Sequence, residues 1–311
     1  MSIQKSSDLV LISEVGPRDG LQSVKSIMST ENKYLWLKTL YEAGLKEVEV
    51  CSFVPPSVLP QMADASEVVN YSKTLKKGTV LALTPNLKGA QLAIQAGVDK
   101  LTVPVSASEA HSMANVKKTC QEMISELKKI VEYKNQTSPD VLIEVGISTA
   151  FGCTLQGNVS EADVISLAFE LANIGVDEIG LSDTAGYANP AQVRRLFKLL
   201  KQEIGDKAGA AHMHNTRGLG LANCLAAFEV GVTTFDSSQG GLGGCPYAPG
   251  ASGNVVTEDL VFMFEAMGVK TGINFDQLLK AREILQAALP GETIYGMTPP
   301  AGLPKGFIFN D

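Results

Sequence analysis

The sequence predicts an α/β fold, a closed (β/α)8 barrel with a C-terminal extension. Short apolar runs alternate with helix-like segments about eight times along the chain, which indicates parallel strands joined by crossover helices. Eight such units favour a closed barrel over an open doubly wound sheet. In addition, the first predicted strand is not followed by GxGxxG, the glycine pattern that a dinucleotide-binding sheet usually carries.

Each predicted strand is a short, mostly apolar run. In chain order the runs are LISEV at 11–15, EVEVCSF at 47–53, TVLALTP at 79–85, KLTVPVS at 100–106, VLIEVGIST at 141–149, EIGLSD at 178–183, AGAAHMH at 208–214 and TTFDSS at 233–238. The carboxyl ends of these strands would meet at one end of the barrel, where proteins of this architecture place their functional residues.

The segments between the strands show the apolar spacing and the start signals of helices. Residues 34, 37, 40 and 41 share one predicted helical face, and residues 116, 120, 123, 127 and 130 share another. Asn189 followed by Pro190 indicates an N-cap and a first-turn proline. Ser160 stands three residues before Asp163, as in a capping box. These signals support the alternation of strands and helices.

The chain shows no linker or composition break before about residue 290. We therefore expect one barrel domain over residues 1–290 and an extended tail over residues 291–311. Within the tail, IYGMTPPAGLPKGFIFND is rich in Pro and Gly. We expect the tail to pack on the barrel or on a second subunit, and the chain to form a homodimer or a higher homo-oligomer.

Composition and charge exclude several classes of function. Of the 311 residues, 45% are apolar and 19% are charged, as in a globular protein with a sizeable core. The net charge of −7 argues against nucleic-acid binding, which needs a basic surface. We expect no signal peptide and no membrane span, which takes about 18 apolar residues. The five cysteines form no CxxC pair, which indicates a reducing, cytoplasmic location.

Charged residues gather where predicted strands end. Arg18 and Asp19 follow the first strand, Asp183 ends the sixth, and Glu49 lies inside the second. Taken alone, the Gly-Pro-Arg-Asp-Gly segment at 16–20 is also compatible with a surface turn. A buried carboxylate such as Glu49 needs a cation nearby, because burying an unpaired charge is unfavourable. We expect Arg18, at the end of the adjacent strand, to be that cation.

His212 and His214 are the strongest sign of a metal site. They stand two residues apart in a predicted strand, so their imidazoles point to the same face. Together with Asp19 and an Asn oxygen from the loop after the eighth strand, they would form a mixed nitrogen and oxygen ligand set. Such a set does not suit a closed structural zinc site, but it suits Mg²⁺ or Mn²⁺ with positions left open for substrate. His111 stands alone, and we expect it to be structural.

Five segments extend these observations. They are EVGPRDGLQ (14–22), VEVCSF (48–53), LTPNLKG (83–89), AHMHNT (211–216) and GGLGGCPYAPGASGN (240–254). Together they resemble the 3-hydroxy-3-methylglutaryl-CoA (HMG-CoA) lyase family, which are metal-dependent TIM-barrel lyases. The resemblance covers roughly residues 10–285. It implies that residues 1–290 form a catalytic domain of the pyruvate carboxyltransferase-like kind.

The resemblance implies a ligand set for the metal and a contact for the substrate. It implies that Asp19, His212, His214 and Asn254 bind the divalent cation. It implies that Arg18 contacts the carbonyl of an acyl-CoA substrate.

The resemblance also implies roles for several acids and a thiol. Cys245, in the glycine-rich loop at 240–254, matches a residue assigned to proton transfer. Glu49 and Asp183 match active-site acids that support the arginine and the substrate hydroxyl. Glu258 matches a further acid near the site.

The implied reaction is retro-Claisen cleavage of (S)-3-hydroxy-3-methylglutaryl-CoA to acetyl-CoA and acetoacetate, as in leucine degradation. The metal would lower the pKa of the substrate hydroxyl, and Arg18 would stabilise the enolate oxygen. A cysteine thiol, with an ordinary pKa of about 8.5, suits Cys245 as the proton donor. The first base stays open among Asp183, a histidine, a water molecule and Cys245.

Basic and amide side chains near the barrel mouth are candidates for CoA binding. The resemblance points to Lys25 and Gln22, in the segment after the first strand, together with Arg18. Lys88, after the third strand, is a weaker candidate. The alternative for either lysine is a solvated surface position.

The sequence departs from the family pattern around its fifth strand. The family commonly has a Tyr there, followed by a Cys-Pro-Tyr-Glu-Gly loop, whereas this chain has Gly146 and Cys-Thr-Leu-Gln-Gly at 153–157. If that position faces the acyl group, the pocket is roomier or differently shaped, unless Phe151 or a neighbouring loop fills the space. The alternative substrate is therefore a related 3-hydroxyacyl-CoA, such as citramalyl-CoA or a longer branched analogue.

Two other classes of function are disfavoured. A synthase similar to isopropylmalate synthase usually carries a C-terminal regulatory domain, and we expect none in this chain. An inactive binding barrel would have lost a metal ligand, Arg18 or Cys245, and all of them are present.

Overall fold

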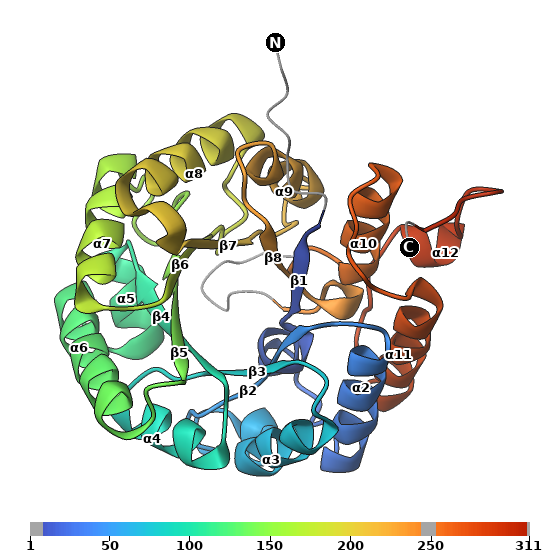
Figure 1. Cartoon of the computed structure of the whole chain (residues 1–311), viewed down its shortest axis with the longest axis horizontal. Helices are drawn as coiled ribbons and strands as arrows, with labels where there is room; N and C mark the ends of the chain where they lie inside the picture. Colours follow the sequence, from blue (N-terminus) through green and yellow to red (C-terminus); the bar gives the residue numbers. More distant parts are fainter. Residues whose placement is uncertain (1–8, 244–252, 310–311) are drawn as a thin grey trace.

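Residues 9–243 and 253–309 are described in a computed structural model, and they form a closed barrel of parallel strands ringed by helices (Figure 1). The strands are β1 (Leu11–Glu14), β2 (Glu47–Ser52), β3 (Thr79–Leu83), β4 (Lys100–Ser106), β5 (Leu142–Ser148), β6 (Glu178–Ser182), β7 (Ala208–His212) and β8 (Thr234–Ser237). Each strand pairs with the next, and β1 also pairs with β8, which closes the sheet. The predicted (β/α)8 TIM barrel is confirmed.

Helices cover the outside of the barrel, and short helical turns shape several of the loops. The longer helices are α2 (Thr30–Glu42), α3 (Ala65–Leu75), α4 (Leu87–Ala96), α5 (Glu109–Val116), α6 (Cys120–Thr137), α7 (Glu161–Ile174), α8 (Pro190–Ile204), α9 (Gly220–Phe228), α10 (Thr257–Ala266) and α11 (Phe275–Ala288). The short ones are α1 (Leu21–Ser23), α12 (Thr298–Ala301), η1 (Gly16–Gly20), η2 (Pro60–Met62), η3 (Gly205–Lys207) and η4 (Gln239–Gly241).

The predicted start signals are confirmed at two helices. Asn189 caps α8 by accepting a hydrogen bond from the backbone N–H of Gln192, and a proline follows at the first helical position. Ser160 caps α7 by accepting the N–H of Asp163, which is one of the two hydrogen bonds of the predicted capping box.

The predicted helical face from residue 116 to residue 130 is wrong, because two helices share that segment. α5 ends at Val116, and Lys117 adopts a left-handed conformation with φ of 57°. α6 starts anew with a capping box between Thr119 and Glu122. The local capping chemistry therefore overrides the apolar period.

The two faces of the sheet differ in chemistry. On β5 the alternate residues Ile143, Val145 and Ile147 are fully buried in the hydrophobic core. The intervening side chain of Glu144 instead contacts Lys100, which also contacts Glu47 of β2. The interior of this barrel is therefore partly polar, whereas barrels of this type usually fill their interior with branched apolar residues.

The segment after α11 packs against the turn η4 and against α10, which Figure 1 shows beside α12. The N–H of Tyr295 donates to the carbonyl of Gly240 at 2.7 Å. The Asp259 carboxylate accepts hydrogen bonds from the N–H groups of Met297 and Thr298. Among the described helices, none has both the length and the apolar character that crossing a membrane requires.

Candidate active site

The turn after β1 places Arg18 and Asp19 at the C-terminal end of the barrel. Residues Gly16–Gly20 form a single π-helical turn, in which the carbonyl of Val15 accepts the N–H of Asp19 at 2.7 Å. Gly16 is required there, because a Cβ atom would lie 2.5 Å from a carboxylate oxygen of Glu14. This tight turn buries both charged side chains instead of exposing them, so it is not a surface turn.

Arg18 is held between two carboxylates. Its Nε donates to Glu49 Oε2 at 2.6 Å, and its Nη1 donates to Asp19 Oδ1 at 2.7 Å. Burial alone would lower the pKa of Arg18, but the charges of Glu49 and Asp19 outweigh it and raise the pKa. The predicted pairing of Glu49 with Arg18 is confirmed. The guanidinium is therefore a fixed positive charge inside the barrel mouth.

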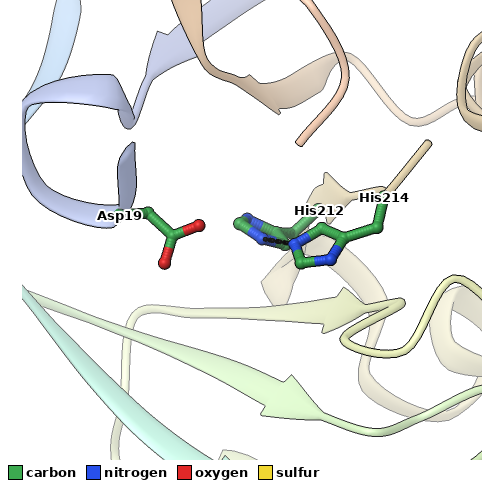
Figure 2. Close-up of side chains that lie close together, drawn as sticks. All are labelled: Asp19, His212 and His214. Atoms are coloured by element: carbon green, nitrogen blue, oxygen red, sulfur yellow. Dashed lines mark hydrogen bonds between the residues drawn. The ribbon is translucent and has the colours of Figure 1, made fainter. Parts of the chain in front are cut away.

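The two histidines converge, although only His212 lies within a strand. His212 ends β7, and His214 forms an isolated bridge with Asn254 beyond it. Their Nε2 atoms lie 3.2 Å apart, and Asp19 points toward both imidazoles from the opposite side (Figure 2). The ligand atoms of Asp19, His212 and His214 all lie within 4.8 Å of one another.

Asp236 of β8 orients His212. Its Oδ2 lies 2.9 Å from Nδ1 of His212, which leaves Nε2 facing the other histidine. Burial alone would lower the pKa of His212, but the hydrogen bond and charge of Asp236 raise it. Sequence reasoning missed Asp236. The available signal was an acid within the predicted strand TTFDSS, in register with His212 on β7.

The donor set fits a divalent cation. Burial lowers the pKa of His214 to about 4, so its imidazole is neutral and can donate a lone pair. Arg18 and the histidines counter the effect of burial on Asp19 and hold its pKa below the usual value. The side-chain oxygen of Asn254 is buried without a hydrogen-bond partner among the described residues. One carboxylate, two imidazoles and an unsatisfied amide oxygen are ligands that Mg²⁺ and Mn²⁺ accept.

Asn254 is held at this site by its amide nitrogen. Nδ2 donates to Asp19 Oδ2 and to the carbonyl of Leu242. The two glycines flanking the loop allow this close approach. A Cβ atom at Gly243 would lie 2.3 Å from Nδ2 of Asn254, and one at Gly253 would lie 2.0 Å from the carbonyl oxygen of Gly241. Both have positive φ, so glycine is needed at both ends of the loop.

Asp183 lies at the end of β6, buried near the histidines. Its N–H donates to the carbonyl of His212 at 2.8 Å. Its Oδ1 accepts the N–H groups of Tyr187 and Ala188, whereas Oδ2 has no partner among the described residues. Burial raises the pKa of Asp183 to about 6, against the lowering effect of these hydrogen bonds.

The remaining predicted residues fall in different places. Gln22 Nε2 donates to Asp19 Oδ1 at 2.8 Å, so this side chain adjoins the proposed metal ligands. Lys25 and Lys88 are exposed. Glu258 is buried at the base of the loop after β8, where it accepts the N–H of Gly240 and pairs with a buried arginine. Cys245 lies outside the described residues.

His111 and Gly146, two further positions singled out in the sequence, lie outside the candidate metal cluster. His111 is buried in α5, with Nδ1 3.1 Å from the hydroxyl of Ser106. A Cβ atom at Gly146 would meet, within 4 Å among the described residues, only Ser182 Oγ at 3.4 Å. Phe151 therefore does not come within 4 Å of that Cβ position. Ser182 is in register with His212, so this space adjoins the candidate site.

Fold and site together define a barrel enzyme with buried acids, a fixed arginine and a candidate divalent-metal cluster at the C-terminal ends of its strands. The chain belongs to the HMGL-like family, whose pattern matches residues 10–285. It is therefore a carbon–carbon lyase of the HMG-CoA lyase type.

Relatives and solved structures agree with this family assignment. The chain is 40% identical over 277 residues to hydroxymethylglutaryl-CoA lyase of Bacillus subtilis, covering 89% of this chain and 92% of that protein. It is 40% identical over 284 residues to the human mitochondrial enzyme, covering 91% and 87%. An HMG-CoA lyase structure from Acinetobacter baumannii, in complex with coenzyme A and 3-methylmalate, superposes with a TM-score of 0.91 at 39% identity and covers 98% of each chain.

Proposed function

We propose that this protein is a divalent-metal-dependent lyase that cleaves (S)-3-hydroxy-3-methylglutaryl-CoA to acetyl-CoA and acetoacetate. The observation that carries the proposal is the convergence of Asp19, His212 and His214 beside an arginine already fixed by Glu49. A cation and a guanidinium side by side suit a substrate with a hydroxyl and a thioester carbonyl. The relatives named for this reaction support the assignment.

The proposed ligands are Asp19, His212, His214 and Asn254, with Mg²⁺ or Mn²⁺ as the metal. Bound there, the cation would lower the pKa of the substrate's tertiary hydroxyl. The chain holds the ligands in place beforehand. Asp236 fixes the ring of His212, and Asn254 donates to Asp19.

Arg18 is the proposed electrostatic catalyst. Cleavage of the C–C bond transfers its electron pair toward the thioester, so negative charge develops on the thioester oxygen. A guanidinium fixed by Glu49 and Asp19 stabilises that charge without having to reorganise.

Two groups are proposed to handle protons. Asp183 has a pKa of about 6, and its Oδ2 accepts no hydrogen bond from the described part of the chain, so it is suited to accept the hydroxyl proton near neutral pH. The enolate carbon then needs a proton, and the family resemblance makes Cys245 our candidate donor.

Arg18 and Lys25 are proposed to contact the acyl-CoA, with Gln22 supporting Asp19. The coenzyme A bound to the Acinetobacter enzyme supports an acyl-CoA substrate.

A second candidate function is the same cleavage of citramalyl-CoA or a longer branched 3-hydroxyacyl-CoA. The observation that favours it is the space beside Gly146, close to Ser182 and hence to His212. A longer branched acyl group would use that space, whereas the citramalyl group is smaller than methylglutaryl and would not need it.

The test is a cleavage assay with Mg²⁺ and with Mn²⁺ on a panel of 3-hydroxyacyl-CoA thioesters, scored by acetyl-CoA release. We expect cleavage of the methylglutaryl thioester that EDTA abolishes. Cleavage of citramalyl-CoA with none of the methylglutaryl thioester would favour the second candidate. No cleavage of any thioester would overturn both. Gly146→Phe tests the longer branched analogues separately, because it should exclude those acyl groups and leave room for the smaller methylglutaryl and citramalyl groups.

A further inference from the structure

A groove at the C-terminal end of the barrel has a composition that suits an anion. It has a volume of about 560 Å³ and is lined by Phe151, Gly152, Gly157, Asn158, Tyr187, Gln192 and Arg217. These residues come from the loops after β5, β6 and β7 and from the first turn of α8. The lining contains one positive charge, two amide side chains and no carboxylate. Its size is in the range of small-molecule sites.

Arg217 is a fixed cation in this groove. Its Nη1 donates to the carbonyls of Ala185 and Gly186 at 3.0 and 2.8 Å. Its guanidinium stacks over the ring of Tyr187 at 4.7 Å, and the absence of a side chain at Gly152 lets that ring pack on the backbone. Within the described residues no carboxylate lies at ion-pair distance from Arg217. Its Nε and Nη2 therefore remain for a ligand.

The groove adjoins the candidate active site. Ala185 and Gly186, whose carbonyls accept from Arg217, stand two and three residues after Asp183. The N–H of Tyr187 donates to the Asp183 carboxylate. The same short loop therefore contacts the proposed catalytic acid on one side and shapes the groove on the other.

We propose that this groove is a carboxylate-binding subsite with Arg217 as its anchor. A carboxylate pairs side-on with Nε and Nη2 of an arginine, which is the edge that Arg217 leaves free. The amides of Asn158 and Gln192 supply further donors. The carboxylate belongs either to the acyl part of an extended substrate or to a free carboxylic acid that binds beside the active site. The first source rests on the function proposed above.

The first experiment measures binding of glutarate, a free dicarboxylate, to the full-length protein by calorimetry without acyl-CoA. We expect saturable binding to the wild-type protein and a loss of about tenfold or more in affinity in Arg217→Gln, because charge-assisted hydrogen bonds are removed. Arg194→Gln on α8 is the matched control. It makes the same change of charge at an exposed arginine that pairs with Glu229, and it should bind glutarate as the wild type does.

A second variant leaves the loop contacts of Arg217 intact. Asn158→Asp changes one exposed lining residue into an acid nearly identical in shape. It should weaken glutarate binding because the new carboxylate competes for Arg217. Absence of glutarate binding to the wild type, or equal affinity in the wild type, Arg217→Gln and Asn158→Asp, would overturn the subsite.

Steady-state kinetics then identify the source of the carboxylate. If the acyl group supplies it, glutarate competes with the thioester and Arg217→Gln raises KM. If a free acid supplies it, glutarate binding and thioester KM are independent. Either pattern, with Arg217-dependent binding, supports the subsite. Glutarate binding in a protein that cleaves no thioester would refute only the proposed function, and normal cleavage without glutarate binding would refute only the subsite.

Discussion

The two ends of the barrel interior both bury charged side chains, but they arrange them differently. At the N-terminal end, Lys100 contacts the carboxylates of Glu47, Glu144 and Glu178 at 2.8–3.3 Å. At the C-terminal end, Arg18 and the two histidines surround Asp19.

The two ends differ in how many buried polar atoms lack a hydrogen-bond partner. The lysine ammonium contacts three carboxylates, so its charge is paired without a ligand, although one oxygen of Glu47 has no hydrogen-bond partner among the described residues. At the C-terminal end, Asn254 Oδ1, His214 Nδ1 and Asp183 Oδ2 are all buried without partners among the described residues. Buried polar groups are normally satisfied. Three unsatisfied atoms around one cluster mark a site that a ligand completes, whereas the lysine cluster is structural.

Lys100→Met tests whether the N-terminal cluster is structural, and it should destabilise the fold. It would leave three carboxylates without their cation, and Glu144 is already so buried that its pKa is raised well above the usual value. Removing one partner of a buried ion cluster typically lowers the free energy of unfolding by about 3–5 kcal/mol. Urea denaturation measures this. Lys128→Met, at an exposed position on α6, is the control, and equal loss in both variants would refute the structural role.

At the opposite end, Arg18→Gln should remove most of the activity. Loss of a preorganised donor to a developing oxyanion typically lowers kcat by about 100- to 1000-fold. Mn²⁺ affinity is measured alongside, because Arg18 contacts the proposed ligand Asp19 and a loss of kcat must be separated from a loss of bound metal. A kcat within a factor of a few of wild type would remove Arg18 from the mechanism.

Much of this arrangement was predictable from the sequence, for a physical reason. Parallel strands bring their carboxyl ends together, so Arg18, Asp19, Asp183 and His212 could be placed at one end from local patterns alone. The pairing of Arg18 with Glu49 followed from the unfavourable burial of a lone carboxylate. Those inferences needed only strand order and charge.

Other features could not be predicted, because they depend on register and loop shape. Asp236 contacts His212 only because β7 and β8 pair Asp236 beside it. The position of His214 outside β7 depends on its bridge to Asn254, 40 residues later in the chain. Likewise, the apolar period from residue 116 to residue 130 predicts one helix, whereas the cap at Thr119 starts a second one. A periodic pattern contains no information on which residues oppose one another across strands.

The raised pKa of Asp183 predicts how the free energy of unfolding depends on pH. Its pKa is raised to about 6 in the folded protein, against about 3.9 for an unfolded chain. The folded state therefore holds a proton that the unfolded state has lost, so this carboxyl makes stability fall as pH rises from about 4 to about 6. The difference corresponds to about 3 kcal/mol.

Asp183→Asn should lack that contribution. In metal-free protein, its free energy of unfolding relative to wild type should rise between pH 4 and pH 6 and stay constant above. Urea denaturation at several pH values measures it, with Asp140→Asn at an exposed turn as the control for charge. Parallel pH profiles for wild type and Asp183→Asn would contradict the raised pKa.

The smallest expected effect concerns Asp236, which contacts a proposed ligand without being one. Asp236→Asn keeps a hydrogen-bond acceptor near His212 Nδ1 but removes the negative charge that makes the imidazole a better donor. Changes to such partners typically weaken metal binding by about 10- to 100-fold. Mn²⁺ titration followed by electron paramagnetic resonance measures the affinity directly, independent of turnover. Thr234→Val, on the same strand, should leave the affinity unchanged. Because Asp236 lies between the two ends of the barrel, its effect separates them: weaker Mn²⁺ binding with normal stability assigns it to the metal site, and lost stability with unchanged Mn²⁺ affinity assigns it to the structural cluster.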